Sequence, residues 1–107
     1  MTKTKICTTT IGSFPKPNYL PIIDWFDSAR GEDGMNTVKT TLEYTKYNEN
    51  KSSKDELLFL RAASEIINIQ LKAGIDVPTD GEVRRENYIH YHCRHLEGFD
   101  FNNLEHR

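Results

Sequence analysis

The clearest pattern in the chain is a helical one, with an apolar residue every three or four positions from about Lys54 to Ala73. These residues are Phe59, Ala63, Ile66, Ile67 and Leu71. Their spacing places them on one face of a helix and predicts a buried stripe. Ser53 and Glu56 have the spacing of an N-terminal capping box, and Gly74 is the residue type that commonly ends a helix.

Two short segments on either side of this helix have the composition of strands. Residues Ile6 to Ile11 are rich in threonine and β-branched side chains and lead into Gly12, whose flexible backbone suits a loop. Residues Ile75 to Asp80 form the second candidate, although Pro78 cannot donate a backbone hydrogen bond there. A strand, a helix and a strand in this order predict a parallel βαβ unit with a right-handed connection.

The chain is too short to be a closed barrel of such units. A TIM (β/α)8 barrel takes about 250 residues and eight strands, whereas this chain has 107 residues and two candidate strands. Either the chain is a fragment or it pairs with something that completes it. As a fragment, residues 1–107 form one domain of α/β fold, the first βαβ portion of an incomplete TIM barrel. A helix is expected to begin at Pro21 and to be broken by Gly31 and Gly34. Further helices are expected over Asn36–Asn50 and Glu86–His95.

Composition narrows the classes of partner. Lys and Arg number 14 against 16 Asp and Glu, so the net charge is −2, and this balance gives no reason to expect nucleic acid or an anionic membrane surface. No apolar stretch is long enough to span a bilayer, and no charged start leads into an apolar run as in a secretory signal. Cys7 and Cys93 are the only cysteines. Two thiols without such a signal predict a reducing, cytoplasmic location.

The loop that follows the first candidate strand is suited to a small anion. It belongs to the run Thr8-Thr9-Thr10-Ile11-Gly12-Ser13-Phe14-Pro15. Gly12 lets the backbone approach a ligand closely, and Ser13 adds a hydroxyl beside backbone amides, a combination that suits a carboxylate. An ordinary Gly-Ser turn has the same pattern.

A second polar cluster follows the other candidate strand, at the strand end where α/β architectures place their sites. Asp80 and Glu82 flank Gly81, and Arg84 and Arg85 come next. A carboxylate here could hold an ammonium group, and an arginine could bind an anion or fix the carboxylates. The start of a solvated helix would favour the same acids without any ligand.

Potential zinc ligands are concentrated between residues 90 and 95, where His90, His92, Cys93 and His95 occur. In a helix, His92 faces away from His90 and Cys93, so no single face presents all of them. The segment therefore predicts an aromatic-rich helix that packs against its neighbours, and we assign no metal ligand and no catalytic residue in this chain. A non-catalytic zinc-binding module built on these side chains is the first competing hypothesis.

Taken together, the motifs resemble the cobalamin-independent methionine synthases. The matching stretches are Thr8–Pro15, Ala73–Val77 with Gly81-Glu82, and Arg85 through His95-Leu96-Glu97-Gly98-Phe99-Asp100-Phe101. The resemblance is to the C-terminal catalytic barrel of that family, and it is weakest between Pro17 and Lys54. Because Met1 lies only a few residues before the first candidate strand, the chain resembles the N-terminal part of a short, single-barrel form, truncated before the zinc-ligand region.

The resemblance implies an enzyme, a homocysteine S-methyltransferase that moves a methyl group from 5-methyltetrahydrofolate to homocysteine and forms methionine. In that family an Ile-Gly-Ser loop and a Gly-Glu carboxylate hold the amino-acid end of homocysteine. Carried over to this chain, the substrate-binding positions are Ile11, Gly12, Ser13 and Glu82, with Asp80 and Arg85 as candidate supporting residues. Ser13 and nearby amides can bind the substrate carboxylate, while ionised Glu82 can accept hydrogen bonds from its ammonium, so that two points orient the thiol.

Zinc is the cofactor that the resemblance implies, because a metal-bound thiol loses its proton and becomes the nucleophilic thiolate. The family's zinc ligands lie downstream of the segment matched here, so we expect the 107-residue chain alone to be inactive. Asp80 stands where long forms commonly carry His, which leaves the methyl donor open between a folate and methylcobalamin. Another barrel methyltransferase with a corrinoid donor, or a uroporphyrinogen-decarboxylase-like protein, is the second competing hypothesis.

Overall fold

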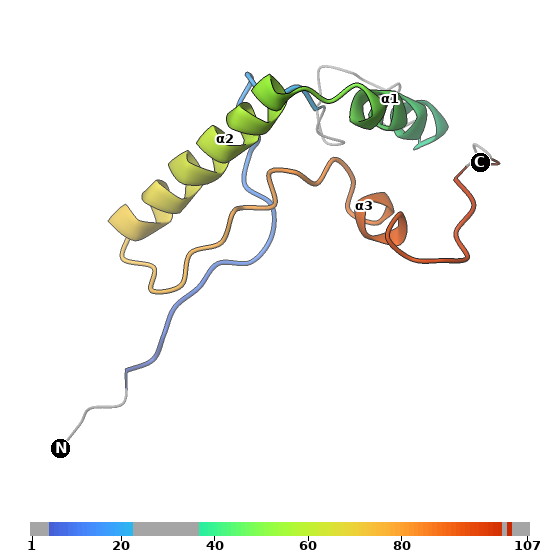
Figure 1. Cartoon of the computed structure of the whole chain (residues 1–107). Coiled ribbons are helices and arrows are strands. Elements are labelled where there is room, and N and C mark those ends of the chain that lie inside the picture. Colours follow the sequence, from blue (N-terminus) through green and yellow to red (C-terminus); the bar gives the residue numbers. More distant parts are fainter. Residues whose placement is uncertain (1–4, 23–36, 102, 104–107) are drawn as a thin grey trace.

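The computed structural model describes residues 5–22, 37–101 and 103 of the chain (Figure 1). Within them the helices are α1 (Thr37–Glu49), α2 (Ser53–Lys72) and α3 (His90–Cys93). Helices α1 and α2 confirm two of the expected helices to within a residue at each end. The expected helix that begins at Pro21 lies mostly outside the described residues. None of the described helices is long and apolar enough to cross a membrane.

Helix α2 is capped one residue earlier than its sequence signal indicated. Ser52 is the N-cap, and its Oγ accepts a hydrogen bond from the Asp55 backbone N at 3.3 Å, while Asp55 Oδ2 accepts one from Ser52 N at 3.2 Å. The expected capping pair of Ser53 and Glu56 was therefore wrong by one residue. The Glu56 carboxylate is instead bound by the guanidinium of Arg84, so it does not turn back to the helix start.

The C-terminal end of α2 agrees with the sequence. Gly74 has a φ of +83°, a left-handed conformation that glycine adopts without steric cost. Its N–H donates to Leu71 O at 3.1 Å, and the N–H of Ile75 donates to Gln70 O at 3.0 Å. This pair of bonds is the Schellman motif, which ends the helix and turns the chain back along it.

One face of α2 carries the core. Its buried residues are Phe59, Ala62, Ile66 and Gln70. The three apolar ones form the core cluster with Leu20, Ile22 and Val83 from the segments on either side of the helix. The expected stripe is thus right at Phe59 and Ile66. It was wrong at Leu71, which is 52% exposed, because the polar side chain of Gln70 occupies the buried position at that end of the helix.

The two expected strands are reduced, among the described residues, to one parallel bridge between Thr9 and Val77. Val77 N donates to Thr8 O at 2.9 Å. Side chains make the neighbouring rungs: Asp76 Oδ2 accepts hydrogen bonds from both N and Oγ1 of Thr8, each at 3.0 Å. Pro78 has no N–H with which to extend the ladder. The full βαβ unit stays a prediction. The bridge makes the two segments parallel to each other, and both lie beside α2 (Figure 1).

The expected helix over Glu86–His95 was wrong in extent, since α3 has only four residues. Asn87 is buried, and its Oδ1 accepts hydrogen bonds from the backbone N atoms of Ile89 and His90, both at 2.9 Å. An asparagine side chain that binds nearby amides in this way competes with helical hydrogen bonds. The helix therefore starts only after Asn87 has made its turn.

Large apolar side chains remain exposed on the described part of the chain. They include Ile6, Ile11, Leu57, Leu60, Ile69, Leu71 and Val77. In a closed barrel, neighbouring strands and helices cover such residues. This exposure fits the expectation of an incomplete barrel.

Gly81 lies close to both α2 and the first segment. Its φ is +65°, and a Cβ atom at this position would lie 2.8 Å from Ile66 Cγ2 and 3.0 Å from Phe14 Cβ. Phe14 N donates to Gly81 O at 2.9 Å. Only a residue without a side chain satisfies both the backbone angle and the space.

We predict that Gly81→Ala destabilises the chain by about 2–4 kcal/mol, from the left-handed conformation plus overpacking against Ile66 and Phe14. Gly74→Ala is the matched control, because Gly74 also has positive φ but a Cβ there would meet nothing within 4 Å. This control should lose only about 1 kcal/mol. Urea unfolding of both variants measures the difference, and equal losses would contradict the packing argument.

The capping assignment makes a second prediction. Ser52→Ala should lower the free energy of unfolding by about 1 kcal/mol, because the Asp55 N–H loses its acceptor. Ser53→Ala, one residue inside the helix, should be neutral or slightly stabilising, since alanine is the better helix former. Thermal unfolding followed by circular dichroism ranks the stability of the two variants. A larger loss in Ser53→Ala than in Ser52→Ala would show that Ser53 is the N-cap.

Glu56 links the start of α2 to the C-terminal segment. Arg84 Nη1 donates to Glu56 Oε2 at 2.9 Å, and Lys51 Nζ lies 2.9 Å from the same oxygen. The hydrogen bonds from Arg84 and then Lys51 lower the pKa of Glu56 from its ordinary 4.5 to about 2. Because the folded-state pKa lies below the unfolded one, this carboxylate stabilises the fold fully above pH 4.5. The contribution is lost as the pH falls towards 2.

We therefore predict that Glu56→Gln makes the loss of stability shallower when urea unfolding is followed from about pH 6 down to pH 2. A decline should remain, because hydrogen bonds from Lys5 and Thr8 also lower the pKa of Asp76. In an Arg84→Gln, Lys51→Gln background, Glu56→Gln should no longer change the slope. If Glu56→Gln alone leaves the pH dependence of the unfolding free energy unchanged, the contact of Glu56 with Arg84 and Lys51 makes no pH-dependent contribution to stability.

Candidate functional site

The two loops that were predicted to share a ligand lie side by side. The hydrogen bond from Phe14 N to Gly81 O, 2.9 Å long, joins the residue after Ser13 to the residue before Glu82. The backbones of the two motifs are therefore in direct contact. The Ser13 hydroxyl itself donates to its neighbour, Phe14 O, at 3.3 Å.

The first loop borders open space. Ile11 is 98% exposed, and Ser13 is also exposed. Gly12 has a φ of +89°, and a Cβ atom there would meet nothing within 4 Å. The backbone at Gly12 therefore borders open space.

Glu82 holds an unusual backbone conformation. Its φ is +56°, the only positive φ at a non-glycine residue in the described part of the chain. Asp80 Oδ1 accepts a hydrogen bond from Glu82 N at 2.9 Å, and Arg85 N donates to Glu82 O at 3.0 Å. Such a conformation costs on the order of 1–3 kcal/mol, persists where the surroundings hold it, and is frequent at functional sites.

The Glu82 carboxylate faces Arg85. Glu82 Oε2 is buried and lies 2.7 Å from Arg85 Nη2, although the angles are not those of a hydrogen bond. The Arg85 guanidinium lies over the Tyr88 ring, 5.1 Å from its centroid, and its side chain is 13% exposed. Asp80 and Arg85 therefore converge on Glu82, one at its backbone and one at its carboxylate.

A buried glutamine beneath both loops was not among the predicted site residues. Gln70 is 2% exposed, and its carboxamide bonds to Thr10 and Thr79. These threonines immediately precede the Ile11 and Asp80 loops. Its sequence signal was a glutamine four positions after Ile66, on the apolar stripe of α2. A buried amide is almost always hydrogen-bonded, so a glutamine on a buried stripe indicates polar partners in the core.

The histidines between residues 90 and 95 contact neighbouring side chains. His90 Nδ1 lies 3.1 Å from Thr41 Oγ1, and burial, then the nearby Arg94, lower the pKa of His90. The Tyr91 ring meets the rings of His92 and His95 edge-on, with centroids 5.4 and 5.7 Å apart. In the part of the chain that the structure describes, no three His, Cys, Asp or Glu side chains are grouped to hold a metal, so these residues provide no donor set that fits zinc.

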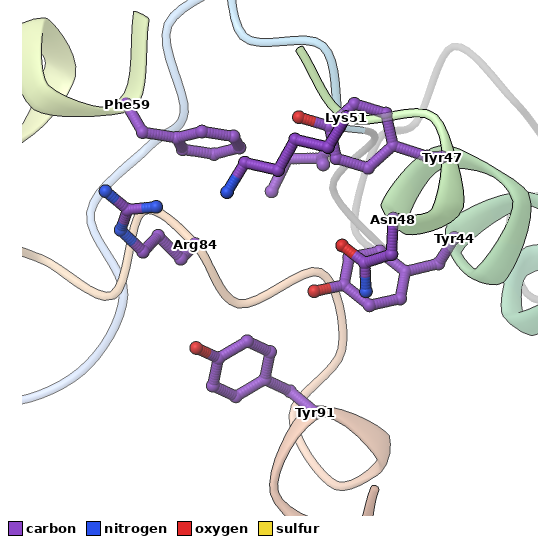
Figure 2. Close-up of a pocket in the computed structure, with 8 residues that line it drawn as sticks. Tyr44, Tyr47, Asn48, Lys51, Phe59, Arg84 and Tyr91 are labelled. Carbon is purple, nitrogen blue, oxygen red and sulfur yellow. The ribbon is translucent and has the colours of Figure 1, made fainter. Parts of the chain in front are cut away.

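A separate pocket opens where α1, α2 and the C-terminal segment meet (Figure 2). Its lining residues are Ile22, Tyr44, Tyr47, Asn48, Lys51, Phe59, Arg84 and Tyr91. The Lys51 ammonium and the Arg84 guanidinium lie 5.1 and 5.0 Å from the centroid of the Phe59 ring. Burial, helped by Asp55, raises the pKa of Tyr47 to about 12.

Both cations of this pocket already have a partner. Lys51 and Arg84 bind the same carboxylate, that of Glu56. Cations that lie over an aromatic ring and share a carboxylate are stabilised without any ligand. We therefore interpret the pocket as a packing junction and assign it no ligand.

Comparison with known proteins places the chain in a family. Residues 6–106 match the family model for the catalytic domain of cobalamin-independent synthase. The chain is similar to the methionine synthase of Saccharolobus solfataricus, with 29% identity over 94 residues, covering 88% of this chain and 23% of that protein. It is also similar to the methionine synthase of Sulfolobus acidocaldarius, with 30% identity over 94 residues, covering 88% and 22%.

The chain spans less than a quarter of the length of these curated relatives. No solved structure matches it significantly. The family model nevertheless covers almost every residue, including both loops of the candidate site, and confirms the resemblance drawn from their motifs. The chain belongs to the family of cobalamin-independent synthase catalytic domains, a family of TIM barrels.

Proposed function

We propose that this chain forms the amino-acid-binding half of a homocysteine S-methyltransferase that produces methionine. Family membership supports the reaction class, and the curated relatives are methionine synthases. The observation that carries the substrate assignment is the hydrogen bond between Phe14 N and Gly81 O. It holds together the two motifs that would bind the two charged ends of one amino acid.

The first loop is the proposed site for the substrate carboxylate. Ile11, Gly12 and Ser13 offer backbone amides beside open space, and Gly12 leaves that side unobstructed. The Ser13 hydroxyl makes a long, local hydrogen bond at 3.3 Å. It can exchange this bond for a stronger, charge-assisted one to a carboxylate by rotation about a single side-chain angle.

Glu82 is the proposed acceptor for the substrate ammonium. Its strained backbone is held by Asp80, and its carboxylate is oriented by Arg85. The side chain as a whole is 35% exposed, so a ligand in the shared loop region can reach it. Binding at both ends would orient the thiol towards the methyl donor, and such orientation is a large part of catalysis between two substrates.

The remaining steps are proposed on family grounds. The methyl donor is a methylated folate, with a corrinoid donor as the alternative. The described residues present no set of donors that fits zinc, so we assign thiol activation to a part of the protein outside them and route no step of the binding proposal through the metal. Two free thiols, Cys7 and Cys93, agree with the reducing, cytoplasmic setting that we propose.

The proposal predicts that Glu82→Gln weakens homocysteine binding about ten- to hundredfold, because an ammonium loses a charged acceptor worth about 1.5–3 kcal/mol. Isothermal titration of the full chain measures this change. Binding of 4-mercaptobutanoate, which is homocysteine without its amino group, should be the same in both proteins. A wild-type chain with no affinity for homocysteine would refute the proposed function.

Asp80→Asn is the matched control for charge. It removes an acid two residues from Glu82 but keeps an oxygen that can accept from Glu82 N. Homocysteine affinity should therefore stay near the wild-type value. If Asp80→Asn weakens binding as much as Glu82→Gln, the ammonium responds to the general negative field and the role given to Glu82 is wrong.

A further inference from the structure

Gln70 is the most fully hydrogen-bonded buried side chain in the described part of the chain. Its Nε2 donates to Ile66 O at 3.1 Å and to Thr79 O at 2.8 Å. Its Oε1 accepts from Thr79 N at 2.9 Å and from Thr10 Oγ1 at 2.7 Å. One carboxamide thus satisfies both backbone groups of Thr79 and the hydroxyl of Thr10 at once.

This arrangement takes the place of a strand-to-strand rung. Bonding to both N–H and C=O of one residue is what a β-ladder does, and here a helix side chain provides it at Thr79. Thr10 Oγ1 also lies 3.1 Å from Thr79 Oγ1, which in turn accepts a hydrogen bond from Gly81 N at 3.2 Å. The contacts therefore continue from Gln70 into the turn that carries Glu82.

The two threonines stand at the start of the two candidate ligand loops. Thr10 immediately precedes Ile11, and Thr79 immediately precedes Asp80. Helix α2 lies against both segments (Figure 1), so a side chain on its buried face can touch both. Gln70 therefore binds the residue before each loop, and the bond from Phe14 N to Gly81 O joins the loops further on.

We propose that Gln70 is a positioning residue that sets the spacing between the carboxylate-binding and ammonium-binding halves of the homocysteine site. The inference rests on the function proposed above. Gln70 does not touch the substrate, and it acts through Thr10 and Thr79. A leucine of similar size would fill the space but leave the Thr79 N–H and C=O without their partner. The two loops would then no longer be bound to the same side chain.

The test compares ligands that carry one charged group with a ligand that carries two. Homocysteine carries both charged groups, 4-mercaptobutanoate keeps only the carboxylate, and 3-aminopropane-1-thiol keeps only the ammonium. In the wild-type chain, homocysteine should bind more tightly than either analogue. In Gln70→Leu, that advantage should fall by about tenfold or more, while the affinity for each one-ended analogue changes little, because each half-site survives and only their spacing is lost.

A purely structural role would weaken all three ligands together. Phe59→Leu provides the matched control, because Phe59 is buried on the same face of α2, 2% exposed, about three turns before Gln70. It should lower stability without changing the ratio of homocysteine affinity to analogue affinity. A wild-type ratio in folded Gln70→Leu would overturn the positioning role.

Thr10→Val keeps the test decisive if Gln70→Leu does not fold. Valine preserves the shape of threonine and removes only the hydroxyl that binds Gln70 and Thr79. The tighter binding of homocysteine relative to the analogues should decrease in Thr10→Val and be retained in Thr10→Ser, which keeps the hydroxyl. If both variants retain it, the inference is overturned. A wild-type chain that binds homocysteine no better than the analogues would instead refute the proposed function.

Discussion

The parallel pairing of residues 8–10 with residues 76–79 is the constraint on which the rest of the structure depends. It contains a single backbone bridge, between Thr9 and Val77, and side chains supply the other rungs. Each such hydrogen bond contributes only about 0.5–1.5 kcal/mol net, but together they define one register. That register places Phe14 beside Gly81 and so decides where both loops of the candidate site begin.

The candidate site stores strain that this pairing must hold. Glu82 has φ +56°, and Gly81 packs against Ile66 with no room for a side chain. The restraints come from both directions, since Asp80 binds the Glu82 backbone and Gln70 holds the preceding Thr79. The loop around Ile11 has fewer restraints and faces open space. A rigid half and an open half suit a site in which one end of the ligand docks on a preorganised carboxylate.

The sequence predicted the helices better than the pairing between segments. Helix α2 follows from periodicity and end signals that lie within a few residues of one another, and α1 lies where a helix was expected. The strands were overestimated, because a β-ladder needs partners far along the chain and only one backbone bridge forms among the described residues. The C-terminal helix was overestimated for a local reason that the pattern did not reveal, the buried side chain of Asn87 binding the amides that follow it.

The sequence by itself determined the long helix, its end at Gly74, the two loop motifs and the family that they indicate. Each of these depends on residues that are close together along the chain. Only the tertiary structure decided that Gln70 and not Leu71 is buried on α2, and that Ser52 is the cap. It also brought Thr10 to Gln70, 60 positions away. The physical reason is that a buried polar group is stable only when its partners are in place, and those partners come from segments that only folding brings together.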